Sequence, residues 1–93
     1  MDYSAMKEGE ITVPNKLGLH ARAAAIFTKQ AAQYTSKIEV IKDHMKVNGK
    51  SIMELLTIAA AKGCRIVIRA EGDDEETAVK NLVSLVKNGF GEK

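Results

Sequence analysis

The clearest strand pattern in the chain has one apolar face and one charged face, and this limits the kinds of sheet that the protein can form. Successive side chains of a strand point to opposite sides. Ile66, Ile68 and Ala70 therefore share one face, while Arg65 and Arg69 share the other. A strand with one solvated face is typical of a sheet that is covered on a single side. We therefore expect helices on one face of the sheet and water on the other.

Turn residues and changes of periodicity divide the rest of the chain into short elements. Further strands are predicted at residues 10–13, 37–42 and 45–47, and helices at 21–33, from 51 up to Gly63 and from 73 up to Gly89. The resulting order, β-α-β-β-α-β-α, predicts one α+β domain with an antiparallel or mixed sheet.

Two of the predicted helices begin with the spacing of a capping box, in which two side chains satisfy exposed backbone donors. The pairs are Ser51 with Glu54 and Asp73 with Glu76. The apolar stripes of these helices are Ile52, Leu55, Leu56 and Ala59 in the first, and Ala78, Leu82 and Leu85, flanked by Val79 and Val86, in the second. We expect these stripes to face the sheet.

The chain has 93 residues, which suits one compact domain. We expect residues 1–8 to be a flexible N-terminal tail and residues 9–93 to form the domain. The net charge of +2 is too small to indicate nucleic-acid binding. The sequence contains no apolar run long enough to predict insertion into a membrane.

Cys64, the single cysteine, has no partner for an internal disulfide or a metal site. It is predicted to be a core residue in a reducing cytoplasm.

His20 lies where a loop becomes the first predicted helix, with Arg22 close behind it and Gly18 before it. The first turn of a helix offers backbone N–H groups and the positive end of the helix dipole, which favour an anion. A guanidinium at Arg22 can bridge phosphate oxygens, so these residues could hold a phosphoryl group. The alternative is a histidine that only caps the helix or faces solvent. His44 lies in a predicted turn without an arginine neighbour and is expected to be solvated.

Four blocks of the sequence resemble one known family. They are Asn-Lys-Leu-Gly-Leu-His-Ala-Arg at 15–22, Val-Asn-Gly-Lys-Ser-Ile-Met-Glu-Leu-Leu at 47–56, Ala-Ala-Lys-Gly at 60–63 and Phe-Gly-Glu at 90–92. In this order they are similar to the HPr family, the phosphocarriers of bacterial phosphotransferase systems. The family fold is an open-faced β-sandwich, a four-stranded antiparallel sheet covered on one face by three helices.

This resemblance implies that His20 takes a phosphoryl group on Nδ1 from phosphorylated enzyme I and passes it to a histidine of an EIIA domain. Arg22 would steady the group, and no metal or organic cofactor would take part. The chain would then be a carrier with a phosphohistidine intermediate rather than a turnover enzyme. The family usually has proline where this chain has Ala23. We expect an intact carrier with a slightly altered first turn or partner preference.

The resemblance also gives meaning to the start of the second predicted helix. In many members the serine at the position of Ser51 is phosphorylated by an ATP-dependent kinase, whereas the local pattern predicts a helix cap. Ile52, Met53 and Leu56 correspond to residues on which partners dock, although core packing would also explain them.

Two other function classes remain open at this stage. One is a non-catalytic regulatory module that acts only by binding, and the other is a ligand-binding α+β domain unrelated to phosphoryl transfer. Within the carrier hypothesis, sugar uptake and nitrogen-related regulation are both compatible with the sequence. Brief contacts with several partners favour a monomer.

Overall fold

The computed structural model describes residues 6–91, which form one four-stranded sheet with three helices. The strands are β1 (Met6–Thr12), β2 (Lys37–Lys42), β3 (Met45–Asn48) and β4 (Arg65–Glu71), and the helices are α1 (Ala21–Ala31), α2 (Ile52–Thr57) and α3 (Glu75–Lys87), followed by a short 3-10 turn, η1 (Gly89–Gly91). The spatial order is β1-β4-β2-β3, and every pair is antiparallel. The α+β prediction and the element order are confirmed.

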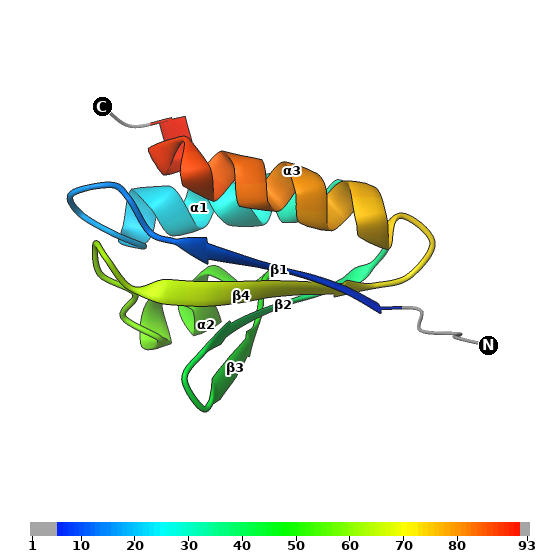
Figure 1. Cartoon of the computed structure of the whole chain (residues 1–93), viewed down its shortest axis with the longest axis horizontal. Helices are drawn as coiled ribbons and strands as arrows, with labels where there is room; N and C mark the ends of the chain where they lie inside the picture. Colours follow the sequence, from blue (N-terminus) through cyan, green and yellow to red (C-terminus); the bar gives the residue numbers. More distant parts are fainter. Residues whose placement is uncertain (1–5, 92–93) are drawn as a thin grey trace.

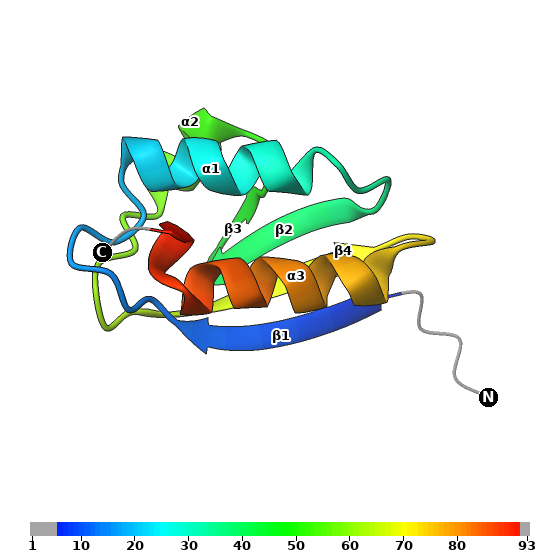
Figure 2. The ribbon, with the colours of Figure 1, turned by 90° about the horizontal axis from the view of Figure 1, so that it is seen from above.

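Helices cover one face of the sheet. α1 and α3 run side by side over it, and α2 lies next to α1 (Figures 1 and 2). Ile66, Ile68 and Ala70 point into this layer and are at most 2% exposed. Leu55 of α2 belongs to the same hydrophobic cluster, so all three helices share one core. The predicted two-sided character of β4 is therefore confirmed.

The uncovered face of the sheet carries ion pairs between neighbouring strands. Arg69 Nε lies 2.7 Å from Glu8 Oε2 on β1, and Arg69 Nη1 lies 3.7 Å from Glu39 Oε1 on β2. Arg65 pairs with Glu10 at 3.5 Å. Exposed pairs of this kind stabilise a protein only modestly. They do neutralise the basic side chains on this face.

β1 begins at Met6, so it includes residues 6–8, which were expected to belong to the tail. Its alternation is hard to recognise because Glu8 and Glu10 occupy the solvated face, while Gly9 takes the place of an apolar residue. A Cβ on Gly9 would lie 2.7 Å from Val83 Cγ2, since α3 packs directly over this backbone. The strand also ends one residue before Val13, which was expected to be part of it. Residues 1–5 of the expected tail lie outside the described residues.

α2 ends at Thr57, well before Gly63, and this corrects the predicted helix. Ala59 adopts a left-handed conformation with φ of +49°, which a helix cannot continue through. Lys42 Nζ donates to the carbonyl oxygens of Ile58 (3.0 Å) and Ala59 (3.4 Å), so β2 supplies the cation for this helix end. Ala59 is consequently exposed, and Ile58 is buried in the core in its place.

The start of α3 differs from the predicted capping box at Asp73 and Glu76. The N-cap residue is Asp74, and its carboxylate accepts hydrogen bonds from across the fold rather than capping the helix. Its donors are the backbone N–H of Thr35 (2.9 Å) and of Ser36 (3.0 Å) and the Ser36 hydroxyl (2.5 Å). These bonds, led by the hydroxyl of Ser36, lower the pKa of Asp74 from its usual value. Asp74 therefore ties α3 to the start of β2.

The apolar stripe of α3 is shifted slightly from the predicted one. Ala78, Val79, Leu82 and Val86 are buried, whereas Leu85 is only half-buried against the core. The helix ends at Lys87, two residues before Gly89, as the glycine predicted.

Candidate functional site

His20 is the N-cap residue of α1, at the end of the molecule that also holds the chain's last turn (Figure 1). Its backbone is extended, with φ of −83° and ψ of −177°, and its carbonyl accepts the first helical hydrogen bond from the Ala24 N–H at 2.8 Å. The half-buried imidazole makes no capping hydrogen bond to the helix. The interpretation of His20 as a mere helix cap is therefore not supported. The N–H groups of residues 21–23 precede the first helical hydrogen bond and directly follow His20 in the chain.

The loop before His20 is held by its own hydrogen bonds. Asn15 Nδ2 donates to the Gly18 carbonyl at 2.8 Å, and the Gly18 N–H donates to the Asn15 carbonyl at 3.1 Å. Gly18 has φ of +65°, and a Cβ there would lie 2.9 Å from Ala61 Cα and collide with the Ala60 carbonyl oxygen. Glycine is therefore required by both the backbone conformation and the close approach.

The segment that follows α2 fixes this loop in place. Leu19 N–H donates to the Ala60 carbonyl at 2.8 Å, Gly63 N–H to the Val13 carbonyl at 2.8 Å, and Val13 N–H to the Cys64 carbonyl at 2.8 Å. The early end of α2 frees these residues to pair with the loop. Leu19 is 5% exposed and anchors the residue before His20 in the core. Cys64 is partly buried against that core, close to its predicted role.

Arg22 projects from the first turn of α1 and is exposed. Within residues 6–91 its guanidinium makes no ion pair or hydrogen bond, which leaves its donors available to an oxyanion. Together with Lys16, Leu17, Ile26 and Phe90 it borders an open hollow of about 470 Å³. The pattern of the sequence did not identify Lys16 and Leu17 as part of this site. Their position in the loop before His20 was the only available signal.

The surroundings of His20 are cationic because of how charges are distributed along the chain. Residues 11–38, 55–70 and 77–91 contain no aspartate or glutamate. These stretches supply α1, the loop before it, the segment after α2 and most of α3. Most acidic residues of the described chain lie instead on the open sheet face and around the turn between β4 and α3, while Asp43 lies in the turn between β2 and β3 and Glu54 in the first turn of α2. A negatively charged group is therefore favoured at the His20 end.

Ala23, which stands where proline is usual, is fully buried as the third residue of α1. Its N–H is among those that precede the first helical bond, so proline there would remove no hydrogen bond of the helix. The departure from the pattern thus leaves the hydrogen bonding of α1 unchanged.

Ser51 is the N-cap of α2, as predicted. Its Oγ accepts from the Glu54 N–H at 3.2 Å. The reciprocal half of the predicted capping box is absent, because Glu54 Oε1 accepts instead from the Asn48 N–H at 2.9 Å. Ser51 is half-buried, and the Glu54 carboxylate belongs to the same first turn.

The residues that follow Ser51 divide between core and surface. Leu55 is fully buried, whereas Met53 is 76% exposed, Ile52 41% and Leu56 38%. Leu17, beside Arg22, is also 65% exposed. Ile52, Met53 and Leu56 belong to α2, which packs next to α1 (Figure 2), and Leu17 belongs to the loop that leads into α1. Core packing alone does not explain them.

Other candidate chemistry is not supported by the geometry. In the described part of the chain, no three His, Cys, Asp or Glu side chains are arranged to hold a metal ion. None of the helices in residues 6–91 is long and apolar enough to cross a membrane. His44 lies in the exposed turn between β2 and β3, away from any arginine in sequence.

Comparison with known proteins assigns the chain to a family. The family model described as "PTS HPr component phosphorylation site" matches residues 7–88. The phosphocarrier protein HPr of Neisseria meningitidis serogroup A is 47% identical over 87 residues, which cover 94% of this chain and 98% of that protein.

Solved structures agree with this assignment. An HPr from Thermoanaerobacter tengcongensis superposes with a TM-score of 0.89 at 48% identity, covering 94% of this chain and 98% of that one. An HPr dimer from the same organism gives 0.74 at 49% identity, with 92% and 99% covered. The fold, the extent of the match and these relatives show that the chain belongs to the HPr family, the phosphocarriers of the phosphotransferase system.

Proposed function

We propose that His20 is the residue of this phosphocarrier that holds the phosphoryl group, on Nδ1. The observation that carries this is the position of His20 as the N-cap residue of α1, directly before the first-turn N–H groups and two residues before Arg22. In the proposed reaction a new N–P bond forms at His20 as the N–P bond of phosphorylated enzyme I breaks. The reverse exchange passes the group to a histidine of an EIIA domain. The first-turn N–H groups and Arg22 stabilise the negative charge on the transferring oxygens.

The test is phosphorylation by enzyme I and phosphoenolpyruvate. The wild-type protein should gain one acid-labile phosphate, and His20→Ala should gain none. His44→Ala is the matched control, because it removes the chain's other histidine from an exposed turn and should be phosphorylated normally. If His20→Ala is still phosphorylated, the assignment is wrong. A wild-type protein that takes up no phosphate would favour a module that acts only by binding.

Ser51 is proposed as a second, regulatory phosphorylation site for an ATP-dependent kinase. Its hydroxyl is half-buried at the start of α2, next to the exposed Ile52 and Met53. A phosphate there would add charge beside the apolar docking surface and weaken the approach of an acidic partner. The Glu54 carboxylate in the same turn would oppose the modification. Incubation with the kinase and ATP, followed by mass spectrometry with Ser51→Ala as control, decides this, and an unmodified Ser51 would rule it out.

Ile52, Met53 and Leu56, together with Leu17, are proposed as the surface on which enzyme I and EIIA dock. The support is their exposure on the α1–α2 side of a molecule whose other large apolar side chains are mostly buried. Apolar residues around a charged site are typical of transient interfaces, and methionine adapts to several partners. The cationic His20 end favours acidic partner surfaces.

We further propose that the carrier works as a cytoplasmic monomer. A small protein that must leave each partner quickly gains from a single accessible site. Sedimentation or light scattering at working concentration gives the mass directly. A stable dimer in solution would exclude the monomer proposal.

A further inference from the structure

Lys42 is the last residue of β2 and lies on the face of the sheet that the helices cover, where charged side chains are seldom found. It alternates along the strand with Ile38 and Val40, which are both 1% exposed. Lys42 itself is half-buried, and no carboxylate within residues 6–91 pairs with it. Its Nζ donates instead to the carbonyl oxygens of Ile58 at 3.0 Å and Ala59 at 3.4 Å. The ammonium group is therefore directed at the backbone that follows α2.

The backbone that receives these hydrogen bonds is held weakly by its own contacts. The Ile58 N–H donates to the Leu55 carbonyl at 3.4 Å, and the Ala59 N–H to the Leu56 carbonyl at 3.3 Å, both longer than is usual for a helix. Ala59 then has φ of +49°, in the left-handed region that alanine disfavours. Such a conformation persists only where its surroundings hold it. Lys42 supplies this hold, since a cation is favoured at the last carbonyls of a helix.

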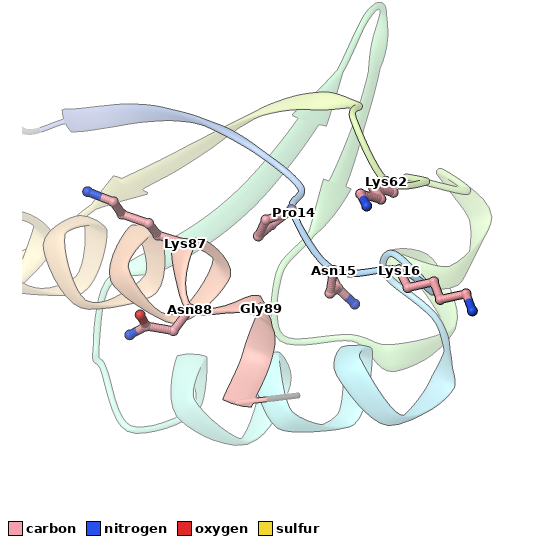
Figure 3. A pocket seen from close by; sticks show the side chains of 7 residues that line it. All are labelled: Pro14, Asn15, Lys16, Lys62, Lys87, Asn88 and Gly89. Carbon is pink, nitrogen blue, oxygen red and sulfur yellow. The ribbon is translucent and has the colours of Figure 1, made fainter. Parts of the chain in front are cut away.

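The next residue, Ala60, connects the same backbone to the loop before α1. Its carbonyl accepts a hydrogen bond from the Leu19 N–H at 2.8 Å, and Leu19 directly precedes His20. Figure 3 shows these two segments from close by, with Asn15 on the loop and Lys62 on the segment after α2. The backbone that the ammonium group holds at residues 58 and 59 therefore holds the His20 loop at residue 60.

We propose that Lys42 is a positioning residue for phosphoryl transfer at His20. It acts through residues 58–60, whose left-handed turn presents the Ala60 carbonyl to Leu19. Without the ammonium group the turn relaxes toward a conformation that alanine prefers, and the Ala60 carbonyl moves away from the loop. A reacting group that is misplaced by about 1 Å can lose about a hundredfold in rate. The inference rests on the proposed role of His20, but the effect on the loop can be observed without any phosphoryl transfer.

The experiment compares Lys42→Met with Lys42→Arg. Methionine keeps an unbranched side chain but cannot donate a hydrogen bond, whereas arginine can still donate to the two carbonyls. Amide chemical shifts of the ¹⁵N-labelled proteins, recorded without a phosphoryl donor, should change at residues 18–20 as well as at 58–60 in Lys42→Met. In phosphorylation by enzyme I, Lys42→Met should lower kcat at least about fivefold and change KM less than about twofold, because the reacting group is displaced while the docking surface remains. Lys42→Arg should restore most of both signals.

The matched control is Lys46→Met, which removes an ammonium group from β3, where it pairs with Glu39 at 3.8 Å on the open sheet face. This variant should keep the wild-type kcat and the wild-type shifts at residues 18–20. Unchanged amides at 18–20 in Lys42→Met would overturn the proposal, and so would an equal loss of kcat in Lys46→Met. Changed amides with an unchanged kcat would overturn it as well, because the reaction would then not depend on the loop.

Ala59→Gly tests the route from Lys42 to the loop. Glycine adopts a positive φ without strain, so the turn no longer needs the ammonium group. In the Lys42→Met background, Ala59→Gly should therefore bring kcat back to within about twofold of wild type. A double variant as slow as Lys42→Met would overturn the proposal. Failure of the His20 assignment would be recognised separately, as phosphorylation that survives His20→Ala.

Discussion

The contact between Gly18 and the segment after α2 leads to a prediction that can be worked through in numbers. Alanine at φ of +65° has an unfavourable left-handed conformation, which costs about 1–2 kcal/mol. Its Cβ would also lie 2.9 Å from Ala61 Cα and meet the Ala60 carbonyl oxygen. Backbone atoms cannot move aside as a side chain can, so this overpacking adds about 1–3 kcal/mol. Gly18→Ala should therefore lose about 2–5 kcal/mol of unfolding free energy.

Gly63→Ala is the matched control. Gly63 also has a positive φ, +88°, but a Cβ there would meet no atom within 4 Å. It should lose only the conformational part, about 1–2 kcal/mol. The effect of alanine on the unfolded chain is common to both variants and cancels in the comparison. A domain of 93 residues has about 5–14 kcal/mol of stability, so both variants should fold.

Urea unfolding of the two variants measures the difference directly, and phosphorylation by enzyme I measures its consequence. The loop must shift to relieve the contact, and His20 follows two residues later. Because misplacing a reacting group by about 1 Å can cost about a hundredfold in rate, Gly18→Ala should be phosphorylated at least tenfold more slowly than Gly63→Ala. Equal stability and equal rates for the two variants would refute the view that this contact positions His20.

Three further outcomes follow from the structure. Because the pKa of Asp74 is lowered in the folded protein, its contribution to the free energy of unfolding is present above the unfolded value of 3.8 and is lost as the pH falls through the folded value. In urea unfolding, Asp74→Asn should therefore be less stable than wild type at neutral pH and lose less stability as the pH falls. A pH profile equal to that of wild type would contradict this. Met53→Glu should slow transfer from enzyme I severalfold by placing a charge on the docking surface, whereas Gln33→Glu, an equal charge change at an exposed site beyond the end of α1, should not. Transfer assays stopped with alkali, in which phosphohistidine is stable, compare the two variants. Ala23→Pro should be phosphorylated at a rate within about threefold of wild type, because no helical hydrogen bond is lost. If the wild-type protein takes up no phosphate and Ala23→Pro does, proline is required at this position.

Local patterns predicted the elements whose stability is local. β4 was recognisable because Ile66, Ile68 and Ala70 alternate with Arg65 and Arg69. The start of α1 followed from the loop glycine and the alanine-rich run after His20. Ser51 was recognised as a cap because its partner, the Glu54 N–H, lies three residues away. In each case the atoms that determine the structure are close together in sequence.

The errors arose where distant residues determine the outcome. The end of α2 depends on Lys42, which is sixteen residues before Ile58 in sequence, and on a left-handed Ala59, which alanine does not favour intrinsically. The Asp74 carboxylate makes no capping hydrogen bond to α3 because it accepts from the N–H groups of Thr35 and Ser36, which are 39 and 38 residues away in sequence. Neither partner could be identified from spacing alone.

The distribution of charge connects the fold with the proposed reaction. Acidic residues of β1 and β2 neutralise the basic side chains of the open sheet face through Arg69, Arg65 and their partners. The other acidic cluster lies in the turn between β4 and α3, at the opposite end of the molecule from the His20 loop (Figure 1). By contrast, Lys16 and Arg22, on either side of His20 in the sequence, make no ion pair within residues 6–91. The acid-free stretches 11–38, 55–70 and 77–91 thus give the end of the molecule that holds His20 an excess of positive charge, which favours the approach of an acidic partner.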